Sequence, residues 1–450
     1  MNGTFACALV AVLAVATVQP AANAAPLVIH EWGTFTSFQD NHGLTISGIN
    51  VDDEPVPKFV HRLADIPIFT TRSSPASWSQ GAPRCHPDVT LRLETPVLYF
   101  YPQSGFPLDR SFDVRATFTD GWLTEFFPAA TAENPGFPRD LGQSAGGSIQ
   151  WKSLRLSREP VVRLPDTTER VWLAPRNVKS AVVINGDKAE AEKYLFYRGV
   201  GHLDAPVIVR TESASLSLSL RNDEKILSAL PRMWVVHVSA DGRLAYRSIG
   251  PGKERTLTAT LPVATSTAPS GLAAVRLELK AALTAEGLYE DEADAMLATW
   301  QLSYFDSEGL RVFFVLPRAW TDAQLPLSTS VSADITRVML GRVELISPHQ
   351  QSVLKDIYEL PAAAFDVPPL YYEDQSVLKL VRDGTASHAD LYRAAGRQVP
   401  DALRLYESLG RFRDALLTHE LHSVPDTEQQ ARLRLVMERF SSCRPEPASR

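Results

Sequence analysis

Two clusters near the start of the chain carry residue types that could do chemistry. The first is the run His30-Glu31-Trp32, and the second is the acidic run Asp52-Asp53-Glu54, which His61 follows seven residues later. Imidazole and carboxylate groups act as general acids and bases and as ligands of divalent cations. We therefore take His30 and Glu31 as candidate catalytic residues.

We take Asp52, Asp53 and His61 as candidate ligands of a divalent metal ion, which is the one cofactor that the sequence suggests. Two features favour a different interpretation. Successive residues point in different directions, and the acidic run lacks the glycine and the terminal glutamate of an EF-hand loop. The interpretation that they favour is a charged surface turn.

The first cluster lies in a stretch that predicts a β-strand, Pro26 to Phe38. Side chains alternate between the two faces of a strand, so His30 and Glu31 should point in opposite directions unless Gly33 marks a bulge. His30 shares its face with three residues that we expect to bind a ligand, Trp32, Thr34 and Thr36. Glu31 lies on the apolar face and should need an arginine or backbone donors.

Glu31, Glu94 and Glu125 each lie in a separate predicted strand, among apolar neighbours. Two such carboxylates facing one cleft would suit acid–base chemistry, for instance glycoside hydrolysis. Arginines such as Arg92 offer the alternative that these acids form structural ion pairs.

Cys85 and Cys443 are the two cysteines that lie beyond the N-terminal leader. In an oxidising compartment two thiols are a natural disulfide pair, which would tie the C-terminal tail to an N-terminal loop. Two free thiols are an alternative, and so is a metal site at Cys85-His86.

Three further matches to catalytic patterns lack the surroundings that the chemistry needs. Residues 142–146 fit G-x-S-x-G without a strand before them or a helix after them. Ser352 and Ser376 begin S-x-x-K matches without the accompanying motifs. His419 and His422 are three residues apart in a predicted helix, where a solvated helix end explains them.

The first 24 residues predict a signal peptide, with a 13-residue run from Ala6 to Val18 that is apolar apart from Thr17, and cleavage before Ala25. That run is shorter than the ~20 residues of a spanning helix. We expect an exported, soluble protein that is periplasmic or secreted and has no transmembrane segment. The net charge of −7 argues against a nucleic-acid partner.

The remaining sequence predicts an α+β protein in three parts. Residues 25–262 read as a mainly antiparallel, β-sandwich-like body, with hairpins at Asp120-Gly121 and at Ala240-Asp241-Gly242 and a strict alternation at Ser215 to Leu220. Residues 271–347 read as an α/β segment packed on that body, with helical spacing over Glu290 to Phe305. Residues 348–450 read as a mostly helical C-terminal region.

Five segments resemble a group of uncharacterised exported bacterial proteins that share an N-terminal HEWGTFT motif. The segments are HEWGTFT (His30 to Thr36), ETPVLYFY (Glu94 to Tyr101), LTEFFP (Leu123 to Pro128), LFYRG (Leu195 to Gly199) and EGLRVFFVLPRAWTD (Glu308 to Asp322). They cover scattered parts of the first three quarters of the chain. The resemblance implies export and a shared architecture, but no reaction.

Two functions remain in view. The chain could bind a glycan or an envelope protein through its β-rich body without catalysis, which the absence of a complete catalytic motif favours. Alternatively, it could be a metal-assisted hydrolase that acts on an envelope or environmental polymer, which the crowding of histidine and acids between residues 30 and 61 favours.

Overall fold

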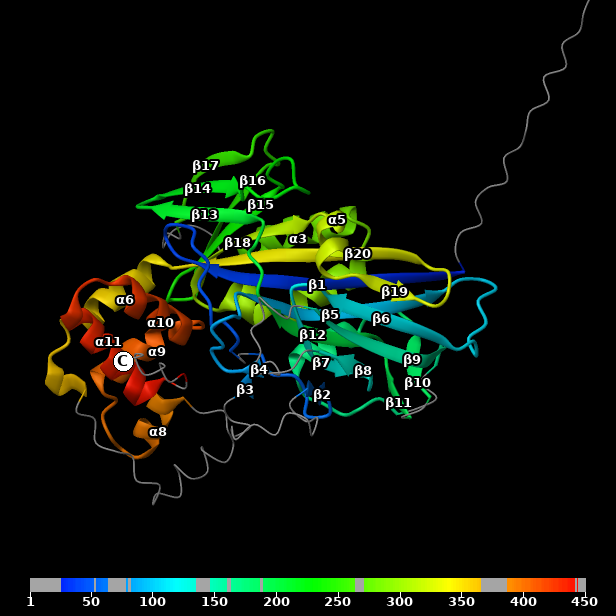
Figure 1. Cartoon of the computed structure of the whole chain (residues 1–450), viewed down its shortest axis with the longest axis horizontal. Coiled ribbons are helices and arrows are strands. Elements are labelled where there is room, and N and C mark those ends of the chain that lie inside the picture. The colour runs from blue at the N-terminus through cyan, green and yellow to red at the C-terminus, as the bar shows by residue number, and fades with distance from the viewer. Residues whose placement is uncertain are drawn as a thin grey trace, which may run out of the picture.

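The computed structural model describes residues 26–51, 54–63, 78–79, 82–134, 146–159, 163–186, 189–263, 271–365, 387–441 and 443. A nine-stranded sheet runs through it in the order β16-β15-β18-β20-β1-β5-β12-β7-β2 (Figure 1). Its strands are β1 (Leu27–Gln39), β2 (His61–Arg62), β5 (Leu91–Pro102), β7 (Gly121–Phe127), β12 (Leu195–Gly201), β15 (Met233–Val238), β16 (Leu244–Ile249), β18 (Gly309–Leu316) and β20 (Asp334–Leu345).

β1 and β20 form the long centre of this sheet and are its only parallel pair. β1 is buried along nearly its whole length, because both faces of the sheet are covered. A strand buried on both faces needs apolar side chains at odd and even positions alike, and β1 has them in Ile29 and Trp32.

A second sheet covers one face and gives the body its sandwich character (Figure 1). It consists of β6 (Phe112–Phe118), β8 (Thr131–Glu133), β9 (Gly147–Ser157), β10 (Val182–Asn185), β11 (Glu190–Glu192) and β19 (Leu327–Thr329). Side chains such as Val114 and Trp151 pack in one core with Ile29 and Phe35 of β1. Two apolar sheet faces bury each other in this way.

Helices cover the opposite face: α2 (Arg170–Arg176), α3 (Leu272–Ala285), α4 (Glu290–Thr299) and a π-helix, η4 (Leu302–Asp306). Leu279 of α3, Met296 of α4 and Tyr304 of η4 share a core with Trp32 of β1. The helical spacing over Glu290 to Phe305 predicts one helix, but the α-helix ends at Thr299 and a π-helical turn follows it.

The C-terminal helices gather at one end of the sheet (Figure 1). They are α6 (Pro348–Glu359), η5 (Ala362–Phe365), α8 (His388–Ala394), α9 (Asp401–Ser408), α10 (Arg413–Ser423) and α11 (Thr427–Phe440). Their apolar faces form a third core, into which Phe38 of β1 and Ile346 after β20 extend. The predicted α+β class, with a helical C-terminal region, is confirmed.

Residues 271–347, which the sequence predicts to pack on the body, also supply two strands of its main sheet. Their strands β18 and β20 lie between β15 and β1, inside the nine-stranded sheet. Residues on both sides of the boundary predicted between the first two parts, at 262–271, therefore build one sheet. No helix in the described part of the chain combines the length and apolar character needed to cross a bilayer.

Three local predictions can be compared with the strands. β15 and β16 form the expected hairpin. In β14 (Ser215–Leu220) the leucines are buried and the serines half-buried, and β13 (Val207–Glu212) and β17 (Thr256–Thr260) flank it in a third sheet. The hairpin predicted at Asp120-Gly121 is wrong, because this turn carries the chain from β6 in one sheet to β7 in the other.

Candidate functional site

A group of buried charged side chains lies where the C-terminal helices meet the nine-stranded sheet. Each is at most about a tenth exposed, although charged groups rarely enter a protein interior without partners. They come from the segment before β2, from β5, from β20 and from the turn between α9 and α10. We call these six residues the polar centre: Glu54, Arg92, Glu94, Arg342, Glu344 and Arg411.

The register of the three central strands aligns the polar centre. Thr34 of β1 lies opposite Glu94 of β5. Thr36 lies opposite Arg92 on one side and Arg342 on the other. Residues that pair across a sheet share a face, so these charges lie on the helix-covered face.

A bulge in β5 directs Glu94 toward that face. Two steps along β1, from Trp32 to Thr34, correspond to three steps along β5, from Val97 to Glu94. The extra residue lets both Val97 and Glu94 face the helices, and Thr95 takes a φ of +46° to allow it. Pro96 thus marks a bulge in an interior strand.

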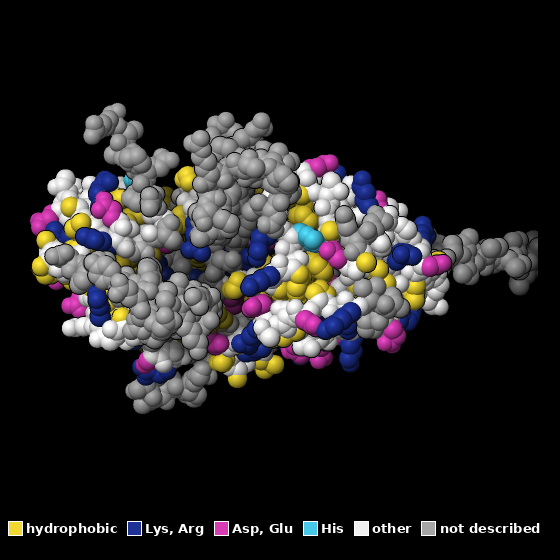
Figure 2. Space-filling model, turned by 90° about the horizontal axis from the view of Figure 1, so that it is seen from below, with side chains coloured by type: hydrophobic (Ala, Val, Ile, Leu, Met, Phe, Trp, Pro, Cys, Tyr) yellow, Lys and Arg dark blue, Asp and Glu magenta, His cyan; other side chains and the backbone are white. Residues whose placement is uncertain are grey.

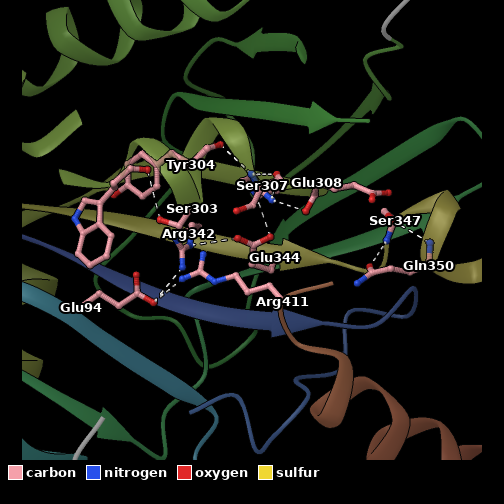
Figure 3. Close-up of polar contacts among 12 residues, drawn as sticks. Glu94, Ser303, Tyr304, Ser307, Glu308, Arg342, Glu344, Ser347, Gln350 and Arg411 are labelled. Atoms are coloured by element: carbon pink, nitrogen blue, oxygen red, sulfur yellow. Dashed lines mark hydrogen bonds and ion pairs between the residues drawn. The ribbon is translucent and has the colours of Figure 1, made fainter. Parts of the chain in front are cut away.

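Glu94 contacts all three arginines of the polar centre (Figure 3). Its Oε1 accepts a hydrogen bond of 3.0 Å from Arg342 Nη2 and lies 3.0 Å from Arg92 Nε. Arg411 Nη2 lies 3.7 Å from the same oxygen and 4.0 Å from Oε2 of Glu54. The two carboxylates therefore share one guanidinium group.

The environment of Glu54 differs from that of Glu94. Burial, together with the nearby negative charge of Glu94, raises the pKa of Glu54 to about 7, against the opposing effect of Arg342 and the Ser303 hydroxyl. Burial also lowers the pKa of Arg411 to about 9. The site thus combines a proton donor that titrates near neutral pH with an ion-paired carboxylate.

The polar centre contains donor atoms and acceptor atoms that make no hydrogen bond. Among the described residues, the buried atoms without a hydrogen bond include Oε2 of Glu54, Oε2 of Glu94 and Nη1 of Arg342. Oε1 of Glu344 also makes none, although it lies 3.3 Å from Arg342 Nε. Buried polar atoms in proteins nearly always have a partner. A small polar ligand or water with both donors and acceptors would supply one.

The π-helix η4 borders the polar centre (Figure 3). The Tyr304 hydroxyl lies 2.5 Å from Thr34 Oγ1, and the Arg342 guanidinium lies 5.6 Å from the centre of the Tyr304 ring. Arg311 donates to the carbonyls of Tyr304 and Ser307, at 2.9 and 3.0 Å. It also bonds Glu344 Oε2 at 3.1 Å, which couples this irregular turn to β20. π-Helical turns occur frequently at functional sites.

His30 and Glu31 point to opposite faces of β1 and do not form one site. His30 Nδ1 lies 2.7 Å from Glu292 Oε2, and the Tyr101 hydroxyl donates to Glu292 Oε1 at 2.7 Å. Burial and the Glu292 carboxylate raise the pKa of Tyr101. Glu31 Oε2 lies 2.5 Å from Arg337 Nε, so the arginine expected for Glu31 is Arg337.

Trp32, Thr34 and Thr36 are fully buried, because α4 and η4 cover the face that we expected to meet a ligand. Trp32 packs against Tyr99 in the core. Thr34 and Thr36 lie beside the polar centre. Their side chains border this candidate site, but they are not among its six residues.

The candidate metal ligands are not joined to His30. Asp52 and Asp53 lie outside the described residues. His61 Nε2 lies 2.9 Å from Glu190 Oε1, on strand β2 at the edge of the sheet. Four strand spacings separate β2 from β1, which is about 19 Å. One metal ion therefore cannot bind both His30 and His61.

The structure joins Cys85 and Cys443 in a disulfide, with Cα atoms 5.8 Å apart. Of the matches to catalytic patterns, residues 142–145 of the G-x-S-x-G stretch lie outside the described residues. His419 and His422 line a surface pocket of about 220 Å³, where His419 Nε2 lies 3.3 Å from Asp40 Oδ2.

A second hollow, of about 380 Å³, shares Thr45 with this pocket and is lined by Asp204, Arg221 and His202. On the face seen in Figure 2, basic and acidic side chains are interspersed over the described part of the surface, and neither charge dominates.

Sequence reasoning named Glu94 but did not name Arg342, Glu344 or Arg411. The alternation of charged and apolar residues in GRVEL, from Gly341 to Leu345, is a local signal for the first two. Arg411 lies in a turn, and nothing in its neighbours indicates that it reaches Glu94.

No known protein family matches the chain, and no curated protein is significantly similar to it.

Proposed function

We propose that the chain is an exported hydrolase that cleaves glycosidic bonds, with the polar centre as its acid–base site. The observation that carries the proposal is that the carboxyl groups of Glu54 and Glu94 converge on Nη2 of Arg411, at 4.0 and 3.7 Å, and that burial raises the pKa of Glu54 to about 7. Glycoside hydrolases use a pair of carboxyl groups, of which one donates a proton and the other carries a negative charge.

Each carboxyl group has a distinct role. Glu54, with a pKa raised to about 7 by burial, carries a proton that it can donate to the leaving oxygen as the glycosidic C–O bond breaks. Glu94, ion-paired with Arg92 and Arg342, supplies a negative charge beside the positive charge that develops on the sugar ring. Water then adds its hydroxyl to the ring carbon, and its proton restores Glu54.

The leftover hydrogen-bonding atoms support a hydroxyl-rich substrate. Arg342 Nη1 is a donor, whereas Glu54 Oε2 and Glu344 Oε1 are acceptors. A sugar hydroxyl can satisfy either kind, because it both donates and accepts. A simple anion would leave the carboxylate oxygens without donors.

The test is hydrolysis of chromogenic glycosides and soluble polysaccharides by the purified mature chain. We expect Glu54→Gln to lower kcat about 10²–10⁴-fold, as loss of a general acid does. Glu192→Gln is the matched control, because Glu192 is also buried and paired with an arginine, but outside the polar centre.

The pH profile adds a second readout. Because Glu54 must carry its proton, kcat/KM should fall as the pH rises above about 7. Absence of turnover on every glycan tested would contradict the proposal, as would full activity in Glu54→Gln.

The two surface hollows beside Thr45 favour a second candidate function, binding of a glycan without cleavage. Asp204 and Arg221 form an ion pair of 3.2 Å there and present both acceptors and donors. Binding measured by calorimetry should weaken in Asp204→Ala, while Asp241→Ala, an exposed control in the β15–β16 turn, should bind normally. Equal affinities in the two variants would show that the glycan does not bind in the hollow.

A further inference from the structure

Three metal-ligating side chains from distant parts of the chain meet beside the surface pocket at His419 and His422. Cys85 follows β4 (Ala82–Pro83), Asp414 lies in the first turn of α10, and Cys443 follows α11. One ligand atom of each lies within 4.8 Å of the other two. In the described part of the chain, this is the group of three or more such side chains that converges closely enough to surround one ion.

The group of three side chains is buried on one side and faces the surface pocket on the other. Asp414 and Cys443 are buried, whereas Cys85 is half-buried and lines the pocket of about 220 Å³ together with Thr418 and His422. Two ligands on the protein side and one at the rim would hold an ion with a coordination position directed to the pocket. Zinc sites that bind an exchangeable molecule have this form, with three protein ligands and one open position.

Asp414 is held in place for such a role. Its Oδ1 accepts a hydrogen bond of 2.7 Å from the Tyr406 hydroxyl of α9. A hydrogen bond from the surroundings to a coordinating carboxylate fixes its orientation in many metal sites. Cys85 has a φ of +55°, a conformation that residues other than glycine rarely adopt, and this places its side chain at the pocket rim.

We propose that Cys85, Asp414 and Cys443 form a zinc site that is controlled by the redox state of the two cysteines. In the oxidised chain the disulfide sulfurs are bonded to each other and do not serve as thiolate ligands. An external dithiol can transfer two electrons and two protons to the disulfide, which gives two protein thiols and the oxidised dithiol. Zinc binding then displaces the two thiol protons.

The ligand set selects the class of metal. Two thiolates and one carboxylate combine soft and hard donors, which suits Zn²⁺ and excludes Ca²⁺ and Mg²⁺, since these prefer oxygen ligands throughout. The site does not depend on the proposed glycoside hydrolysis, because none of its three residues belongs to the polar centre.

The test compares metal binding by the oxidised and reduced mature chain. After reduction with a phosphine and removal of the reductant under nitrogen, Co²⁺ serves as a spectroscopic substitute for Zn²⁺. We expect one Co²⁺ per reduced chain, with a thiolate-to-cobalt absorption band that excess Zn²⁺ removes, and no such band in the oxidised chain.

Variants identify the ligands. Cys443→Ser should abolish the band, and Asp414→Asn, which keeps the acceptor for Tyr406, should weaken Zn²⁺ binding at least 10-fold. Asp401→Asn, an exposed aspartate of α9, is the control and should bind like the wild type. The proposal is overturned by a reduced chain that takes up no metal, whether folded or unfolded, by an unchanged band in Cys443→Ser, or by wild-type affinity in Asp414→Asn.

Discussion

Glu54 shows how burial can give an ordinary side chain a new protonation state. Glu54 is 8% exposed and its carboxyl group lies near Glu94, so the charged form is disfavoured although Arg342, Arg92 and Arg411 lie nearby. Because Glu54 holds its proton more tightly in the folded chain, the folded state binds more protons between about pH 4.5 and 7. The contribution of this group to the free energy of unfolding therefore falls as the pH rises through that window.

We expect Glu54→Gln to gain stability relative to the wild type as the pH rises from 5 to 8. The gain should be about 3 kcal/mol, which corresponds to the raised pKa at 1.36 kcal/mol per unit. Urea denaturation of both proteins at the two pH values measures it. A difference between variant and wild type that does not change with pH would show that Glu54 titrates normally.

Glu31 and Arg337 illustrate the opposite case, in which a buried ion pair is a structural element. Both side chains are buried, and Glu31 also accepts a hydrogen bond from Tyr197. Arg337→Met should destabilise the fold by about 3–5 kcal/mol, because a buried carboxylate then lacks its cation.

The double variant Glu31→Gln/Arg337→Met tests the cause. In urea denaturation it should recover much of the lost stability, since both charges of the Glu31–Arg337 pair are then removed. A double variant as unstable as Arg337→Met alone would assign the loss to packing of the arginine stem.

The bulge in β5 is the element that brings Glu94 into the polar centre, and Gly33 of β1 accommodates it. A Cβ atom at Gly33 would lie 3.0 Å from the Cα of Pro96 and 3.1 Å from Sδ of Met339. Both contacts are closer than ordinary van der Waals separation, and the first is to backbone.

Gly33→Ala should therefore lower the free energy of unfolding by about 1–3 kcal/mol, as overpacking of a core does. Chemical denaturation measures the loss. Gly250→Ala is the control, because a Cβ there meets no atom within 4 Å. Similar stability of the two variants would indicate that β1 and β5 can separate at the bulge.

Local patterns predicted those elements whose pairing is also local. The β15–β16 hairpin follows from its turn residues, and β14 follows from strict alternation. The turn at Asp120-Gly121 has the same local features but joins two sheets, because Phe118 and Trp122 are each buried in a different core. Which sheet each strand enters depends on its pairing partners, β9 for β6 and β12 for β7, which lie outside the turn.

At the scale of the whole molecule, the polar centre combines parts that the sequence keeps far apart. Glu54 and Arg411 come from near the two ends of the chain, and β5 and β20 supply the residues between them. Sequence reasoning reached Glu94 as a buried acid, and it placed Thr34 and Thr36 on the face of the site. It could not reach Arg411, whose position depends on how the C-terminal helices dock on Phe38.

The Cys85–Cys443 disulfide closes a loop across nearly the whole described chain, with a sequence separation of 358 residues. Such a link limits the freedom of the unfolded chain, and its removal typically costs about 2–5 kcal/mol. Thermal unfolding should therefore begin at a lower temperature in Cys85→Ser/Cys443→Ser than in the oxidised wild type. Identical unfolding of the two would mean that the helices stay docked without the link.

The parallel pairing of β1 with β20 also determines when this protein can fold. Glu31 meets Arg337 in the adjoining strand, 306 residues later in the chain. At the usual ~5–20 residues per second of synthesis, β1 waits tens of seconds before its partner exists. During that time a 13-residue strand with apolar side chains on both faces exposes one unpaired edge, which is the kind of surface that aggregates. A newly made chain should therefore require a holding chaperone until residue 345 has been made.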